Sequence, residues 1–153
     1  MTPPQHTLQL LLERAEAERD AVQLRALRAA ETARRLATQA EQLLAYRDEY
    51  RRRAPAHGAK AAEIGLLRCH RDFMQRLEQA IAQQRVQLET AERDAAVLHH
   101  ALLAQETRVA SVRKLIERRT QEARRAAARV EQRRSDEDAL RAGWALRAAG
   151  NSP

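Results

Sequence analysis

Apolar residues recur every seven positions along the first third of the chain. One row at this spacing holds only apolar or amphipathic residues, namely Leu8, Ala15, Val22, Ala29, Leu36, Leu43 and Tyr50. A companion row, four positions later, is mostly alanine and consists of Leu12, Arg19, Ala26, Ala33, Ala40 and Arg47. A sustained seven-residue repeat is typical of helices that pack along their lengths as a coiled coil. The pattern predicts a helix over about residues 8 to 53.

The same repeat resumes after a break and runs through most of the remaining chain. Its apolar row consists of Leu67, Met74, Ile81, Leu88, Ala95, Leu102, Val109, Ile116, Ala123, Val130, Glu137 and Trp144. Only Glu137 interrupts it. The row predicts a second helix over about residues 63 to 148, followed by a frayed tail at 149–153.

Helix-breaking residues mark where these helices begin and end. We expect Thr7, which follows two prolines, to cap the first helix. No further Pro or Gly occurs before Pro55, and the sequence Ala-Pro-Ala-His-Gly at 54–58 is the strongest internal turn signal. With a turn region at about 54–62, the prediction is an all-α fold, a long two-helix antiparallel coiled-coil hairpin that forms a single domain. Because the second helix is longer, its C-terminal part must overhang, bend or meet another protein.

The composition argues for a binding role and against catalysis. Aromatic residues make up 3% of the chain, and four Gly and four Pro leave no Gly-rich phosphate loop. The five His show no metal-binding spacing, since the adjacent His99 and His100 point to different helix faces. A two-helix rod also offers no concave pocket that would exclude water. We therefore expect no enzyme activity, no cofactor and no metal.

The cysteine content and the lack of long apolar stretches indicate the cellular compartment and the kind of membrane contact. Cys69 is the only cysteine, so an internal disulfide is excluded and a reducing cytosol fits. No stretch approaches the roughly 18 uncharged apolar residues that a membrane span needs. Any membrane contact is therefore expected to be peripheral.

The chain is strongly basic, with a net charge of +7 and a pI of about 10.8. The segment 113–134 concentrates nine basic residues against Glu117, Glu122 and Glu131. It can be a solvated helix face, a surface for an acidic partner, or a contact for a phosphate backbone. Interleaved acids and the lack of aromatic residues among the arginines disfavour nucleic acid.

Two matched stripes flank the turn region and depart from a uniform coiled coil. Each follows the spacing i, i+4, i+7, i+11, which keeps its members on one side of a helix. The stripes are Gln39, Leu43, Tyr46 and Tyr50 in the first helix and Phe73, Leu77, Ala80 and Gln84 in the second. The pairs Gln39/Gln84, Leu43/Ala80, Tyr46/Leu77 and Tyr50/Phe73 have numbers that add to 123, as facing residues of an antiparallel hairpin would. This arrangement predicts the register.

The stripes have two interpretations. Tyr50, Phe73 and their neighbours can simply seal the end of the hairpin, and Leu43 and Leu77 fall on rows that face the other helix. Tyr46 and Phe73 lie beside these rows, where their rings would stay partly exposed. Exposed aromatic rings on a slim rod indicate a binding site.

The same segments resemble the FliJ family of flagellar type III export proteins. The resemblance is carried by the run Tyr46 to Arg51, Tyr-Arg-Asp-Glu-Tyr-Arg, and by the segment Phe73 to Arg85 beyond the turn. It continues more weakly from Leu115 to Trp144 and includes the total length, so it covers most of the chain.

The resemblance implies a flagellar export component that couples an ATPase to an export gate. Such a protein is a cytoplasmic stalk, peripheral on the cytoplasmic face of the cell membrane at the flagellar base. Its terminal end would enter the ring of the export ATPase FliI, and its hairpin end would face the gate protein FlhA. Export chaperones and the ATPase regulator FliH are further implied partners, without assigned residues. The gate-binding residues that carry over are Gln39, Leu43, Tyr46, Tyr50, Phe73, Leu77 and Ala80. Gln84 completes the predicted surface but departs from the family, in which a His is common at this position.

Other functions remain open from the sequence. A stalk protein of a virulence-type III secretion system shares this architecture. A basic nucleic-acid-binding coiled coil and a purely structural, self-associating coiled coil are further alternatives.

Overall fold

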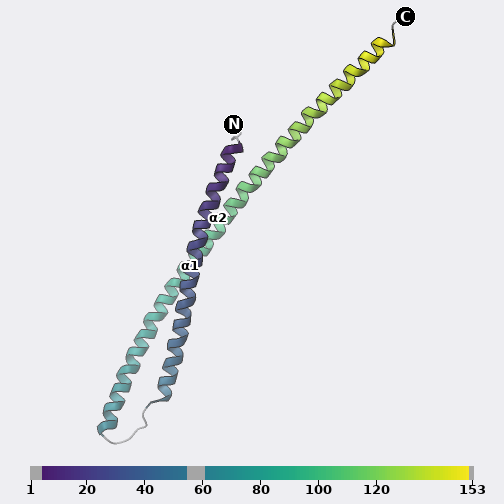
Figure 1. Cartoon of the computed structure of the whole chain (residues 1–153). Coiled ribbons are helices and arrows are strands. Elements are labelled where there is room, and N and C mark those ends of the chain that lie inside the picture. The colour runs from purple at the N-terminus through teal and green to yellow at the C-terminus, as the bar shows by residue number, and fades with distance from the viewer. Residues whose placement is uncertain (1–4, 55–60, 152–153) are drawn as a thin grey trace. The chain divides into compact units, whose positions relative to one another are not determined.

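Two long helices make up the part of the chain that the computed structural model describes, residues 5–54 and 61–151. Helix α1 spans Gln5–Arg52 and helix α2 spans Ala61–Ala149 (Figure 1). No strand occurs within these ranges. The helices pack against each other as an antiparallel hairpin, which confirms the predicted fold class.

The helix ends differ in detail from the expected ones. Helix α1 already includes Gln5, so Thr7 lies in its first turn and the prediction that Thr7 caps the helix is wrong. At the other end, the amide of Arg53 donates to the Tyr50 carbonyl at 3.2 Å, and the chain leaves the helix. Most of the predicted turn at 54–58 lies outside the described residues. Helix α2 ends where the amide of Gly150 donates to the Leu146 carbonyl at 3.1 Å.

The chain divides into two compact units. One consists of Glu16–Glu106, which holds α1 from Glu16 onward and α2 as far as Glu106. The other combines Met1–Ala15 with Thr107–Pro153. Both predicted rows of α1 are buried or half-buried along their whole length, so together they form the face of α1 that packs on α2.

Helix α2 uses two rows as well, and its apolar pattern predicts only the first. The predicted row is buried or half-buried from Leu67 to Ile116, whereas its later members from Ala123 to Trp144 are exposed. The second row, of which the sequence places only Leu77 against the other helix, consists of His70, Leu77, Gln84, Ala91, Leu98, Gln105, Val112 and Arg119. Together the two rows alternate in steps of three and four, the spacing of a coiled-coil seam.

Polar residues within this seam define its register in the unit Glu16–Glu106. The side-chain amide of Gln84 donates to the Leu36 carbonyl and to Oε1 of Gln39, both at 3.2 Å. Nε2 of His70 lies 3.1 Å from the Tyr50 carbonyl, which can only accept, so the imidazole donates. A slip of one helical turn would break both contacts.

Removing the Gln84 amide is therefore expected to weaken the hairpin. A half-buried side chain that makes two hydrogen bonds contributes about 1 kcal/mol net, so Gln84→Ala should lower the free energy of unfolding by about that amount. The measurement is urea denaturation followed by circular dichroism. Gln87→Ala, one turn later and exposed, is the control and should change it by only a few tenths. Equal curves for the two variants would contradict the role of Gln84.

The second unit has a short buried core and a long exposed helix. Leu8, Ala15, Val109 and Val112 are all at most 8% exposed. From Gln121 to Asn151 every described side chain is exposed. Neither described helix is long and apolar enough to cross a membrane.

Candidate partner-binding surface

Three aromatic side chains gather near the ends of the helices that the turn region joins. The ring centroids of Tyr50 and Phe73 lie 4.4 Å apart, those of Tyr46 and Tyr50 5.6 Å, and those of Tyr46 and Phe73 6.5 Å. These distances are typical of aromatic pairs that attract one another. Tyr46, Tyr50 and Phe73 form the aromatic cluster, which holds three of the four aromatic residues of the chain.

The structure tests two of the four predicted pairings directly. Gln39 and Gln84 share a hydrogen bond, and Tyr50 and Phe73 have adjoining rings, so both pairs are confirmed. The pairings Leu43/Ala80 and Tyr46/Leu77 follow from the same register and stay predictions.

The two stripes are not uniform, because their members alternate between the seam and one flank of the hairpin. Leu77 is 7% exposed, and its seam neighbours Leu43, Tyr50 and Gln84 are half-buried. The other four are exposed and share one side: Gln39, Tyr46, Phe73 and Ala80. Tyr46 is 47% exposed and Phe73 36%. The four seam residues therefore seal the hairpin, whereas the four exposed residues stay accessible to a partner.

His70 packs against the aromatic cluster, and the sequence does not predict this contact. Its ring stacks on Tyr50 with centroids 5.7 Å apart and an interplanar angle of 21°. Beside it lies an open hollow of about 480 Å³, lined by Tyr50, Arg53, Leu66, Cys69, His70 and Phe73. No hydrophobic signal marks His70, because it is a polar member of the second row of α2.

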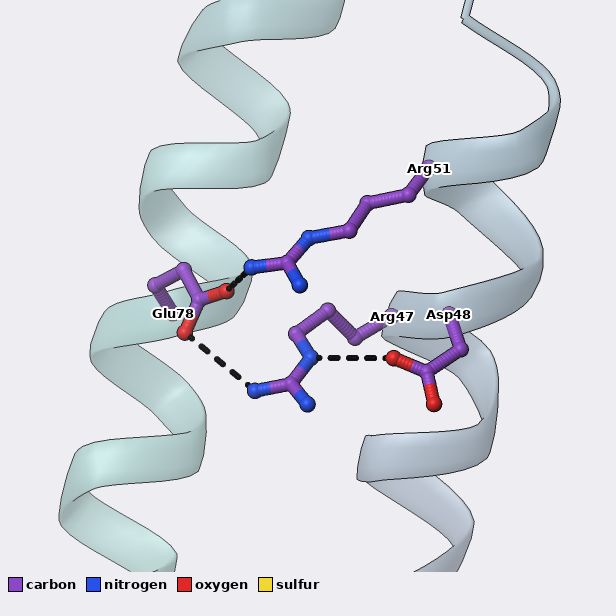
Figure 2. A network of polar contacts seen from close by, with 4 residues as sticks. All are labelled: Arg47, Asp48, Arg51 and Glu78. Carbon is purple, nitrogen blue, oxygen red and sulfur yellow. Dashed lines mark hydrogen bonds and ion pairs between the residues drawn. The ribbon is translucent and has the colours of Figure 1, made fainter.

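The opposite flank of the hairpin carries charges instead of rings. Figure 2 shows Glu78 of α2 accepting a hydrogen bond from Arg51 of α1 at 2.8 Å and pairing with Arg47 at 3.8 Å. Arg47 also donates to Asp48 at 3.3 Å. These groups are partly or largely exposed, so each pair contributes at most about 1 kcal/mol. Tyr46 and Arg51 are five positions apart, which places them on different sides of α1.

The hairpin therefore has two flanks of different chemistry. The family model described as Flagellar FliJ protein matches residues 4–147. This chain belongs to the FliJ family. Comparisons with curated proteins and with solved structures return no significant match.

Family membership makes the chain a component of the flagellar protein export apparatus. The match covers nearly the whole of both helices and includes the aromatic cluster and the long exposed part of α2. The FliJ family consists of non-enzymatic structural components. The family match agrees with the resemblance that the sequence shows from Tyr46 to Arg51 and from Phe73 to Arg85.

Other chemistry-bearing residues of this FliJ-family chain form no site among the residues described. No group of three or more His, Cys, Asp or Glu is placed to hold a metal ion. The rings of His99 and His100 lie 6.3 Å apart, and both are exposed. Cys69 is exposed at the edge of the hollow and carries a free thiol.

The arginine-rich segment 113–134 spans the last covered turns of α2 and the start of its exposed part. Arg119 is half-buried, whereas Arg124, Arg125 and Arg129 are exposed. Gln132 donates to Asp136 at 2.9 Å within the same helix. The segment offers solvent a mixed, mainly basic surface.

Proposed function

We propose that this FliJ-family chain links the export ATPase FliI to the export gate protein FlhA. The gate binds the accessible half of the two stripes together with the aromatic cluster. The ATPase ring binds the exposed C-terminal part of α2. ATP hydrolysis belongs to FliI, and this chain holds the two partners in a defined relation.

The observation that carries the proposal is the half-exposed aromatic cluster. Aromatic rings dominate binding energy because they remove a large apolar area from water with little loss of conformational freedom. This chain has few rings and places Tyr46 and Phe73 at 47% and 36% exposure on one flank. Their contacts with Tyr50 hold them in place, so little ordering is needed when a partner binds.

The ATPase-binding surface is argued from the exposed part of α2. Leu140, Trp144 and Leu146 are 63%, 72% and 75% exposed, although they are large and apolar. Isolated helices of this kind are marginally stable in water, because tertiary packing normally supplies most of their stability. A partner that covers these side chains and pairs with the neighbouring arginines would stabilise the helix, and a ring of subunits provides such a surface.

Coupling follows if the two surfaces are joined by stiff elements. Helix α2 is one continuous helix that contributes residues to both surfaces, and a state imposed at one surface can bias the other only through such a connection. The chain would act in the cytoplasm and reach the membrane only peripherally, through its partners. Export chaperones and FliH are further candidate partners, for which no residues are assigned.

Stimulation of FliI tests the ATPase half of the proposal. The full chain is expected to raise the rate of ATP hydrolysis by hexameric FliI, and a chain that ends at Thr120 is expected to have no effect. The truncation leaves the buried seam intact because residues 121–151 are all exposed. A chain that ends at Ala149 serves as the control and should stimulate like the full chain. Equal stimulation by the chain ending at Thr120 would contradict the proposal.

A further inference from the structure

The coiled-coil seam of α2 continues beyond the residues that α1 covers. Ile116 and Arg119 are the last half-buried members of the two rows. Continuing each row in steps of seven gives eight positions, which we name the free seam: Ala123, Ala126, Val130, Arg133, Glu137, Leu140, Trp144 and Arg147. All eight are exposed, including Val130 at 48% and Trp144 at 72%. No described part of the chain packs on this seam.

The free seam is complementary to itself in the antiparallel direction. In an antiparallel pair of helices, residues of one row face residues of the other row of the partner. If facing residues have numbers that add to 270, the pairs are Ala123/Arg147, Ala126/Trp144, Val130/Leu140 and Arg133/Glu137. A small residue then faces the large indole, apolar faces apolar, and the single acid of the seam faces an arginine.

We infer that a second copy of this chain covers the free seam and forms an antiparallel, two-fold symmetric homodimer. Because the interface is two-fold symmetric, each of the four pairs occurs twice. A parallel dimer would instead place Arg133 against Arg133 and Glu137 against Glu137, which repel. The charge pattern of the seam therefore selects the antiparallel arrangement.

The association is weak and depends on concentration. Two seam positions are alanines that bury little area. Arg134 lies on one flank of the seam beside Arg134 of the second copy, and Asp136 lies on the other flank beside Asp136 of the second copy, so like charges repel on both flanks. Dissociation constants on the order of 10 µM are expected for such a short seam. The dimer does not rest on the proposed function, but a ring that takes up the same segment would compete with it.

Sedimentation equilibrium of the full chain, under reducing conditions, tests the dimer. Between about 1 and 200 µM the mean mass should rise from 17.4 kDa toward twice that value. Glu137→Arg and Arg133→Glu should each raise the dissociation constant at least tenfold, because each places like charges together twice. The double variant Arg133→Glu with Glu137→Arg should restore association. Glu131→Arg, an equal change of charge away from the free seam, is the control and should associate like the native chain.

Cysteine cross-linking tests the direction. With Cys69→Ser as background, Val130→Cys mixed with Leu140→Cys should give a covalent dimer on oxidation, whereas either variant alone should not. A monomer at every concentration overturns the inference. So does association that Glu137→Arg leaves unchanged, or cross-linking of Val130→Cys to itself.

Discussion

Replacing Tyr46 and Phe73 by alanine together is expected to weaken binding to the cytoplasmic domain of FlhA by at least tenfold. Truncating an aromatic residue at the centre of an interface costs about 2 kcal/mol, and 1.4 kcal/mol corresponds to a factor of about ten. Both rings are exposed on the same flank, so removing them should affect the partner more than the hairpin. Isothermal titration calorimetry measures the change.

The control for this variant lies on the other flank. Leu44→Ala removes an apolar side chain of similar exposure, 38%, two positions from Tyr46 on α1, and is expected to leave the affinity unchanged. Far-UV circular dichroism should show the same helicity for both variants. Equal affinities for the double variant and the native chain would show that the aromatic cluster is not the gate-binding surface.

The second large effect concerns the seam beneath the cluster. Leu77 is 7% exposed between the two helices, and Leu77→Asp replaces a packed side chain by a carboxylate that the helices largely shield from water. The lost packing and the buried charge should together lower the free energy of unfolding by about 3 to 5 kcal/mol. Amide hydrogen exchange near Tyr50 and Phe73 should accelerate by two or more orders of magnitude, because the hairpin opens locally.

Gln79→Asp introduces the same carboxylate two positions later, on an exposed face of α2. Its effect on stability should stay within about 0.5 kcal/mol. If the amide hydrogens near Tyr50 and Phe73 exchange at the native rate in Leu77→Asp as they do in Gln79→Asp, Leu77 does not hold the helices together.

The apolar rows of α1 could be predicted in full because nearly all their members are apolar or alanine. The second row of α2 could not, since His70, Gln84, Gln105 and Arg119 carry no hydrophobic signal. Their burial identifies them as seam positions, and for His70 and Gln84 so do their contacts with backbone carbonyls of α1. Gln105 even keeps a buried side-chain oxygen that has no partner among the described residues. A polar residue tolerated in a seam is therefore invisible to hydrophobic periodicity.

The candidate surface was predictable in register and, for four of its residues, in exposure. Pairing Gln39 with Gln84 and Tyr50 with Phe73 required only the turn and the seven-residue repeat. The seven-residue rows place Leu43 and Leu77 against the other helix and leave Tyr46 and Phe73 beside it, as the structure has them. The ion pairs of Glu78 depend on side-chain conformations that spacing does not determine.

Simultaneous binding of both partners tests the central claim most directly. Analytical ultracentrifugation of the chain mixed with FliI and the FlhA cytoplasmic domain is expected to show one complex that contains all three proteins. The chain ending at Thr120 should bind only FlhA, the Tyr46→Ala/Phe73→Ala variant should bind only FliI, and the two variants mixed should not join the partners. Mutually exclusive binding of FliI and FlhA, or three-protein complexes formed by either variant alone, would contradict a link built from two separate surfaces.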